Sequence, residues 1–146
     1  MPYLMNACDI YAASSRLEGF GLPQIEAGAS GKPVLGINAM GMLDTLVHGE
    51  TAFLAGVATE VAMRETTVGQ ESGWEPGHRV VFKNPHTVDY RASIHDIANY
   101  LMDLMGNAEL RRKMGEAGRK RVVQNYDYRV VAKKFVEIVS ERLGIS

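Results

Sequence analysis

The sequence predicts an α/β fold: a Rossmann-like parallel sheet with flanking helices, extended by a β-hairpin insertion and C-terminal helices. Short apolar runs alternate with helical segments in the first 55 residues, the pattern of a parallel sheet with right-handed crossovers. Residues 57–90 hold two strand-like stretches around a cluster rich in Gly and Pro, which indicates a hairpin. From Ile94 onward, apolar residues recur at helical spacing, which predicts closing helices.

Three strands are expected in the sheet. Asp9–Ser14, Val34–Ile37 and Thr51–Ala55 are short and mostly apolar, as are strands buried on both faces of a parallel sheet. Ligands of such sheets bind at the carboxyl ends of the strands. We therefore expect the loops after Ser14 and Ile37 to lie on one rim and to form the site.

Two helices are expected between these strands, and one before them. Leu22–Ser30 is rich in small residues, so it can lie close to a sheet, and Gly31-Lys-Pro33 ends it. A short helix is expected over Met42–Val47, after the turn Asn38–Gly41. The opening residues Met1–Cys8 read as the end of a helix that is already under way.

A β-hairpin with a long loop is expected over residues 57–90. The segments Val61–Val68 and His78–Phe82 are predicted to pair as strands, and Gly69–Gly77 to form the tip. Trp74 lies in this tip, where core packing alone would not place it. Two interpretations stay open: Trp74 folds back over the hairpin, or it offers an aromatic face to an acceptor, a carbohydrate or a partner.

The C-terminal third is predicted to be helical, with helices over residues 94–106, 108–124 and 127–143. The second of them carries the basic clusters Arg111–Lys113 and Arg119–Arg121, interleaved with glutamates. We expect these clusters to be solvated and not to bind phosphate. The last helix has an apolar face, which we expect to be partly exposed and to favour self-association.

The most informative segment runs from Glu18 to Glu26 and reads Glu-Gly-Phe-Gly-Leu-Pro-Gln-Ile-Glu. Gly19 and Gly21 allow a positive φ or a close approach to a ligand, and Pro23 suits the first position of a helix. The free N–H groups at this helix start, with the positive end of the helix dipole, form a site for phosphate. Glu26 would sit at about the fourth helical position, with its carboxylate leaning back over the turn. Two carboxylates at an anion-binding turn suit a ligand with both phosphates and hydroxyls, such as a nucleotide sugar.

Further residues around this segment complete a known pattern. They are Ala7-Cys-Asp9, Ser14, Gly31-Lys-Pro-Val34, Gly41 and His48-Gly-Glu-Thr51. With Glu18–Glu26 they resemble the C-terminal donor-binding half of a retaining GT-B glycosyltransferase. The closest match is glycosyltransferase family 4, the group 1 transferases, with their Glu-x7-Glu signature. The resemblance covers residues 3–55 closely and resumes weakly over residues 94–143.

The resemblance implies roles for the two glutamates and the turn between them. Glu18 would contact hydroxyls of the transferred sugar at the reacting end, as the catalytic residue. Glu26 would accept hydrogen bonds from the ribose hydroxyls. The backbone N–H groups that follow Gly19 would bind the distal phosphate of the donor. This donor-binding turn consists of Gly19, Phe20, Gly21 and Leu22.

The second loop would line the sugar pocket with Asn38, Met40 and Gly41. Ala39 and Met40 depart from the more usual glycine-rich form of this loop. The resemblance implies a reaction without metal or cofactor, because positive side chains and amides neutralise the leaving diphosphate. The only substrate called for at this half of the site is the nucleotide-sugar donor.

The length is that of one ordinary domain. We predict a single partial domain over residues 1–146, with a core at 1–56 and 91–126, an insertion at 57–90 and a C-terminal helix at 127–146. Because a GT-B enzyme needs two Rossmann-like domains, the resemblance implies that the N-terminal acceptor domain is missing. It implies that the first part of the donor domain, which should carry the basic phosphate clamp and the base-reading loop, is missing too. We expect a fragment that transfers no sugar alone.

Composition narrows the partners and the compartment. The net charge is −1, so no attraction to nucleic acid is expected, and no apolar run is long enough to span a bilayer. Cys8 is the only cysteine, which fits a buried packing residue in a reducing, cytoplasmic setting. Peripheral membrane association of the parent protein stays open. His78 and His86 have no Cys or carboxylate at ligand spacing, so we expect surface histidines and no metal.

Two other functions stay open. A nucleotide-sugar isomerase of the same fold, such as a 2-epimerase, would need a further acid–base pair near the sugar. Neither His48 nor Asp44 is convincingly placed for that role. A non-catalytic binding module is the other alternative.

Overall fold

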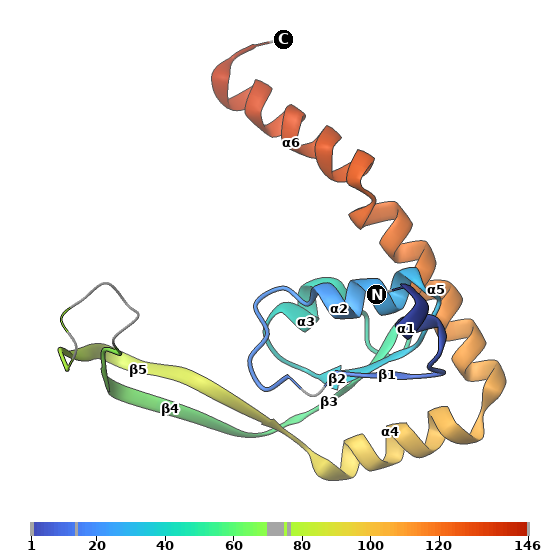
Figure 1. Cartoon of the computed structure of the whole chain (residues 1–146), viewed down its shortest axis with the longest axis horizontal. Coiled ribbons are helices and arrows are strands. Elements are labelled where there is room, and N and C mark those ends of the chain that lie inside the picture. Colours follow the sequence, from blue (N-terminus) through green and yellow to red (C-terminus); the bar gives the residue numbers. More distant parts are fainter. Residues whose placement is uncertain (1, 14, 70–74, 76, 146) are drawn as a thin grey trace.

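The computed structural model describes residues 2–13, 15–69, 75 and 77–145. It confirms the α/β fold class, with a parallel sheet between helices and a hairpin that extends away from this core (Figure 1). The tip residue Trp74 lies outside the described residues, so both interpretations of it stay predictions.

The sheet has three parallel strands in the order β1-β2-β3. They are β1 (Tyr11–Ala12), β2 (Val34–Ile37) and β3 (Ala52–Ala55), and Val34 pairs with Tyr11 on one side and Ala52 on the other. Every residue of β2 is buried, as predicted for a strand covered on both faces. The prediction of such a strand over Asp9–Ser14 is wrong: β1 has two residues, and Ala12 is exposed. As the edge strand of the sheet, β1 has a neighbour on one side only.

Six helices are present in the described part of the chain. They are α1 (Pro2–Asn6), α2 (Leu22–Ala29), α3 (Gly41–Thr45), α4 (Ile94–Gly106), α5 (Ala108–Tyr126) and α6 (Tyr128–Leu143). The last three begin with side chains that cap the first turn. Ser93 accepts the N–H of Asp96 through its hydroxyl, and Asn107 accepts that of Leu110. Caps of this kind satisfy N–H groups that have no partner within a helix.

Two apolar clusters cover the two faces of the sheet. On one face, α2 and α3 pack on β2 and β3 through residues that include Ala27, Met42 and Val34. On the other, Leu104 of α4 and Met114 of α5 pack on Leu35. The clusters place α2 and α3 opposite α4, as Figure 1 also shows.

Close contact between α2 and α5 depends on glycines. Gly28 faces Gly118, and a Cβ at Gly115 would overlap the carbonyl oxygen of Gly31. Small residues therefore let α2 lie tightly against its neighbour, which fixes the start of α2 relative to the sheet.

Three arginines of α5 cap the carboxyl ends of other helices. Arg111 donates to the carbonyl of Leu104 at 2.6 Å, and Arg119 to that of Ala29 at 2.6 Å. Arg121 donates to that of Thr45 at 2.9 Å. The prediction that both basic clusters are solvated is therefore wrong in part. A cation at a helix C-terminus satisfies free carbonyls and the negative end of the dipole.

The hairpin consists of β4 (Val57–Thr67) and β5 (Arg79–Ala92), paired antiparallel. It confirms the predicted hairpin, but its strands are longer than predicted. Glu65 pairs with Val81 as expected, whereas Val61 pairs with Asp89, beyond the predicted strand. The register shifts because β5 carries extra residues between Val81 and His86, which is the effect of a β-bulge.

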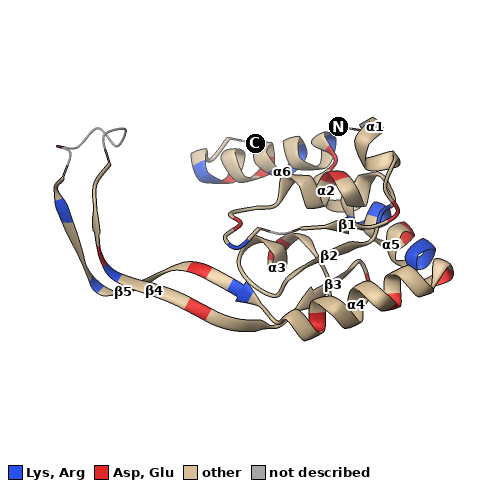
Figure 2. Ribbon diagram, turned by 60° about the horizontal axis from the view of Figure 1, so that its bottom comes forward, with Lys and Arg blue, Asp and Glu red and all other residues tan. Residues whose placement is uncertain are grey.

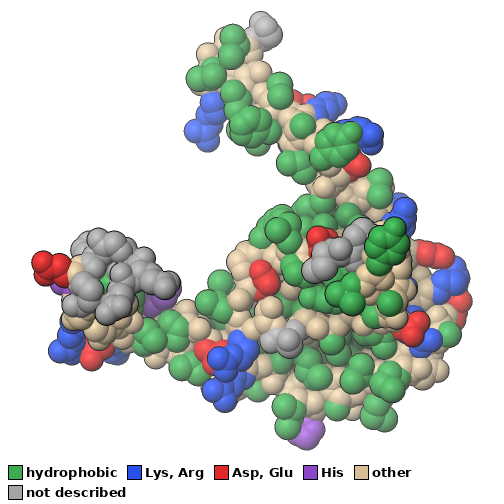
Figure 3. All heavy atoms as spheres, viewed as in Figure 1, with side chains coloured by type: hydrophobic (Ala, Val, Ile, Leu, Met, Phe, Trp, Pro, Cys, Tyr) green, Lys and Arg blue, Asp and Glu red, His purple; other side chains and the backbone are tan. Residues whose placement is uncertain are grey.

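The last helix, α6, projects from the core toward the top of Figure 1, whereas β4 and β5 extend to the left. Its hydrophobic side chains are visible along its surface in Figure 3, and Phe135 is 66% exposed. The predicted exposed apolar face is present; self-association through it stays a prediction. In the part of the chain that the structure describes, no helix is long and apolar enough to cross a membrane.

The two remaining predictions on single residues have mixed outcomes. Cys8 is half-buried, not buried as predicted, because α1 ends beside it, and its thiol donates to the carbonyl of Met5 at 3.1 Å. His78 and His86 are exposed, as predicted, and the His86 ring stacks on that of Phe82.

Candidate functional site

The two loops predicted to form the site are in contact at the carboxyl ends of β1 and β2. The N–H of Gly41 donates to the carbonyl of Glu18 at 3.0 Å. A Cβ at Gly41 would overlap the carbonyl of Gly19 and lie 2.7 Å from the Cα of Phe20. Only glycine therefore lets the second loop approach the first so closely.

The turn before α2 adopts the backbone conformation that its glycines predict. Gly21 is the N-cap of α2 with φ 90° and ψ 52°, and no side chain of the cap itself satisfies the N–H groups. A proline follows in the first helical positions, as predicted. Since L-residues rarely adopt a positive φ, Gly21 fixes the direction in which α2 begins.

The carboxylate of Glu18 faces this helix start. Its Oε1 accepts the N–H of Gly21 at 3.1 Å and that of Phe20 at 3.4 Å. Its Oε2 accepts the hydroxyl of Ser15 at 3.4 Å. The turn thus binds an anionic oxygen with the same N–H groups that the sequence predicts for the donor phosphate. In this conformation the anion is the side chain predicted to contact the sugar.

Tyr11 links the two predicted glutamates electrostatically. Burial raises the pKa of its hydroxyl above the usual value, and the charges of Glu18 and Glu26 raise this pKa further. The two carboxylates therefore act on one point at the rim of the sheet. Glu26 itself is exposed on α2. Sequence reasoning missed Tyr11, whose only signal was its place in the first strand.

The second loop holds a strained residue. Met40 has φ 54° and ψ −145°, and within the described ranges it is the only residue other than glycine with a positive φ. This region of backbone space is nearly restricted to glycine and costs about 1–3 kcal/mol for other residues. Met40 is one of the two residues that depart from the usual glycine-rich form of this loop. Its strain indicates that the loop keeps its geometry although Met40 is not a glycine.

The side chain of Phe20 contacts the last turn of α5. Its ring meets that of Tyr126 edge-on, with centroids 6.0 Å apart, and the Tyr126 hydroxyl donates to the carbonyl of Asp44 at 2.9 Å. The turn of the first loop and helix α3 are therefore both supported by Tyr126. Sequence reasoning assigned only the backbone of Phe20 a role.

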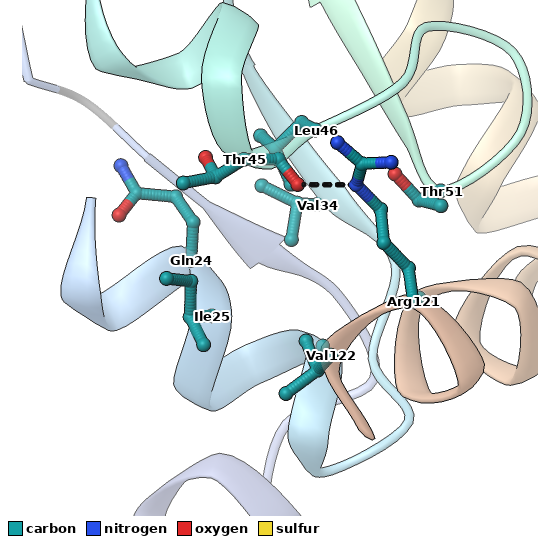
Figure 4. Close-up of a pocket in the computed structure, with 10 residues that line it drawn as sticks. Gln24, Ile25, Val34, Thr45, Leu46, Thr51, Arg121 and Val122 are labelled. Atoms are coloured by element: carbon teal, nitrogen blue, oxygen red, sulfur yellow. Dashed lines mark hydrogen bonds between the residues drawn. The ribbon is translucent and has the colours of Figure 1, made fainter. Parts of the chain in front are cut away.

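A small cavity lies behind the site between α2, α3 and α5 (Figure 4). Arg121 donates through Nε to the carbonyl of Thr45 at 2.9 Å on its border. The cavity measures about 10 Å³, which is at most the room for one water molecule. It is a gap in the packing and not the site of a nucleotide sugar.

The hairpin brings charged residues to the first loop that sequence reasoning did not place there. Asp89 of β5 lies 3.3 Å from the Nε of Arg16 and 3.5 Å from that of Arg91. Sequence reasoning missed this contact, because Arg16 and Asp89 are more than 70 positions apart. Among the described residues, no group of three or more His, Cys, Asp or Glu side chains could hold a metal ion.

Comparison with known proteins identifies the first part of the chain. Residues 1–65 match the family model described as glycosyl transferases group 1. This part of the chain is therefore similar to group 1 glycosyltransferases. All the site residues of both loops lie within this match, whereas β5 and the C-terminal helices lie outside it.

The chain is also similar to individual proteins. It is 28% identical over 126 residues to the capsular polysaccharide biosynthesis glycosyltransferase CapM of Staphylococcus aureus, and the match covers 86% of this chain and 24% of CapM. The chain thus spans about a quarter of the length of the curated relatives it matches.

The chain has the fold of solved GT-B glycosyltransferases. Anabaena HepE, solved in complex with UDP, matches with a TM-score of 0.68 at 22% identity, over 97% of this chain and 30% of HepE. The C-terminal domain of the group 1 family protein LpcC from Francisella tularensis matches with a TM-score of 0.55 at 26% identity. That match covers 86% of this chain and 47% of the solved domain.

Proposed function

We propose that this chain is the donor-binding part of a glycosyltransferase that moves a sugar from a nucleotide sugar to an acceptor hydroxyl with retention of configuration. The observation that carries the proposal is the pair of hydrogen bonds from the N–H groups of Phe20 and Gly21 to a carboxylate. A turn that binds a carboxylate at a helix start has the donors that a phosphate needs. The UDP complex of HepE supports the choice of a nucleotide.

Donor binding would exchange one anion for another. The distal phosphate would take the N–H groups of Phe20 and Gly21, and Glu18 would leave them. Glu18 would then be free to accept hydrogen bonds from hydroxyls of the transferred sugar. The exchange keeps the helix start satisfied in both states, because each anion offers oxygen acceptors to the same donors.

The remaining predicted residues would bind the two ends of the donor, the ribose and the sugar. Glu26, exposed on the first turns of α2, would accept hydrogen bonds from the ribose hydroxyls. Asn38, Met40 and Gly41 would line the sugar pocket, with Gly41 holding the two loops together. The leaving diphosphate would be stabilised by amides and the α2 dipole, so the proposal needs no metal or cofactor.

The structure engages His48, one of the residues considered for an isomerase, in other contacts. His48 accepts the N–H of Leu54 through Nδ1 at 3.0 Å, and its ring packs on Tyr100. These contacts give His48 a structural role, and they favour transfer over isomerisation as the function.

A residue-resolved titration tests the proposal. Uridine diphosphate added to the isotope-labelled chain should shift the amide resonances of Phe20 and Gly21. Glu50, an exposed residue outside the site, offers a matched control, and Glu50→Gln should leave the titration unchanged. Unmoved amides at Phe20 and Gly21 with both uridine and guanosine diphosphate would contradict the proposal.

The activity of the chain alone is part of the proposal. Because donor and acceptor must be held together for transfer, we propose that the acceptor side comes from a second domain and that this chain alone transfers no sugar. Donor-dependent transfer by the purified chain would contradict the proposal that it is inactive alone.

A further inference from the structure

A second, larger cavity lies between the carboxyl ends of the strands and the base of the hairpin. It measures about 220 Å³. Its apolar walls include Ala13 and Ile37 at the ends of β1 and β2, and Ile97 of α4. The hairpin contributes Tyr90 and Arg91. The insertion therefore forms part of a cavity next to the first site loop.

Two arginines line this cavity and share one carboxylate. Arg16 and Arg91 each approach Asp89 through Nε, at 3.3 and 3.5 Å. The arginine side chains are 66% and 62% exposed, whereas that of Asp89 is only 13% exposed. Oδ1 of Asp89 is ion-paired with Arg16 but accepts no hydrogen bond from the described residues. Two cations and one anion give these three residues a net charge of +1, and basic and acidic positions adjoin on the ribbon at the end of β5 nearest the core in Figure 2.

Backbone contacts join the cavity to the donor turn. The N–H of Tyr90 donates to the carbonyl of Arg16 at 3.1 Å, so the edge of β5 is tied to the first loop. Ser15, which also lines the cavity, donates to the Glu18 carboxylate at 3.4 Å. A ligand in the cavity and a donor at the turn would therefore lie on either side of the segment 15–18.

The layers of the fold separate the two ligands. The donor turn begins α2, which covers one face of the sheet. Ile97 belongs to α4, which covers the other (Figure 1). A ligand in the cavity approaches the Glu18 loop from the α4 side and leaves the N-terminus of α2 open to the donor.

We propose that this cavity binds an anionic group, a phosphate or a carboxylate, and that the group belongs to the acceptor. The guanidinium groups of Arg16 and Arg91 offer exposed N–H forks, whose geometry matches both kinds of anion. The apolar walls suit the carbon skeleton that carries the anion. The assignment to the acceptor rests on the proposed function, whereas anion binding does not. The hairpin, through Tyr90 and Arg91 at the end of β5, would then select the acceptor.

Inorganic phosphate and acetate serve as probes for the two kinds of anion. Added to the labelled chain, at least one of them should shift the amide resonances of Arg16, Tyr90 and Arg91. Arg91→Gln should weaken this binding about fivefold, the upper end for one exposed ion pair. Asp89→Asn should strengthen binding, because it removes the competing carboxylate; a variant that merely unfolds the hairpin would not bind more tightly.

Arg79 provides the matched control. It lies in the same strand, is similarly exposed, and pairs with Glu65 far from the cavity. Arg79→Gln removes the same charge and should leave anion binding unchanged. If it weakens binding as much as Arg91→Gln does, the attraction comes from net charge and the proposal is overturned.

The titration with uridine diphosphate separates this proposal from the proposed function. Unmoved amides at Arg16, Tyr90 and Arg91 with both anions would overturn the cavity proposal, even where uridine diphosphate still shifts Gly21. Anion shifts at Arg91 without any effect of nucleotides at Gly21 would support the anion site and overturn the donor role.

Discussion

The carboxylate of Glu18 accepts the N–H of Gly21 over 3.1 Å. A side chain therefore occupies the helix start whose N–H groups we propose for the donor phosphate. Because both are anions that need the same donors, they compete, and binding of the donor would move Glu18 toward the sugar. The relationship predicts opposite effects for changes at the two glutamates.

Glu18→Gln should tighten binding of uridine diphosphate, by up to about tenfold, because an amide oxygen competes less well than a carboxylate for the turn. Glu26→Gln should weaken it by about 1.5–3 kcal/mol for each charged hydrogen bond lost. Isothermal titration of both variants, with Glu50→Gln as control, measures the difference. Effects of the same sign would contradict the competition between Glu18 and phosphate.

Met40→Gly should stabilise the chain by about 1 kcal/mol. Glycine relieves the strain of a positive φ, and its greater freedom in the unfolded chain offsets part of the gain. Thermal unfolding followed by circular dichroism checks the shift. Ala39→Gly is the matched control: Ala39 is buried and its φ is not positive, so this change should destabilise. A loss of stability in Met40→Gly would show that the side chain packs in a way that outweighs the strain.

Gly41→Ala should destabilise the chain by about 2–4 kcal/mol, because a Cβ there would collide with the backbone of the first loop. The collision should also displace the donor turn, so nucleotide binding should fall in the fraction that stays folded. Chemical denaturation and the amide titration measure the two effects. Gly106→Ala, at the end of α4 with open space around it, should be neutral or slightly stabilising. Equal behaviour of the two variants would contradict the close contact of the loops.

Tyr11 should ionise at higher pH than a free tyrosine, whose pKa is about 10. Burial raises its pKa first, and the charges of Glu18 and Glu26 add to this shift. A raised pKa means that the folded chain favours the neutral phenol. The stability from this preference is fully present below about pH 10 and is lost as the pH rises through the pKa of the folded state.

Near-ultraviolet absorbance during an alkaline titration reports the Tyr11 phenolate. Tyr11→Phe should remove the phase that Tyr11 contributes, and Glu18→Gln should move that phase to lower pH. Tyr3→Phe, at a position that is 93% exposed, is the control and should leave the phase in place. If this phase occurs at the same pH in Glu18→Gln, the carboxylate does not act on Tyr11.

The elements that sequence predicts correctly depend on local chemistry. Strand β2 is a short apolar run, and α2 begins where glycines precede a proline. These features act within a few residues, through φ preferences, missing donors and burial. The contact between the two site loops was also predictable, because parallel strands place their carboxyl ends at one edge of the sheet.

Tertiary structure alone decided the features that join distant segments. Helix ends attract Arg111 and Arg119, which the sequence shows only as basic clusters. The edge position of β1 shortened a strand whose apolar pattern predicts burial on both faces. Neither outcome is visible in a window of neighbouring residues, because each depends on which element happens to lie beside another.

The candidate site divides in the same way. The sequence by itself determined the anion-binding turn, since Glu18, Gly21 and the start of α2 are within a few positions of one another. Only the tertiary structure decided that the end of β5 would bring Asp89 and Arg91 to Arg16. The reason is physical: backbone preferences are local, whereas electrostatic partners are chosen by distance in space, and a bulged hairpin sets that distance.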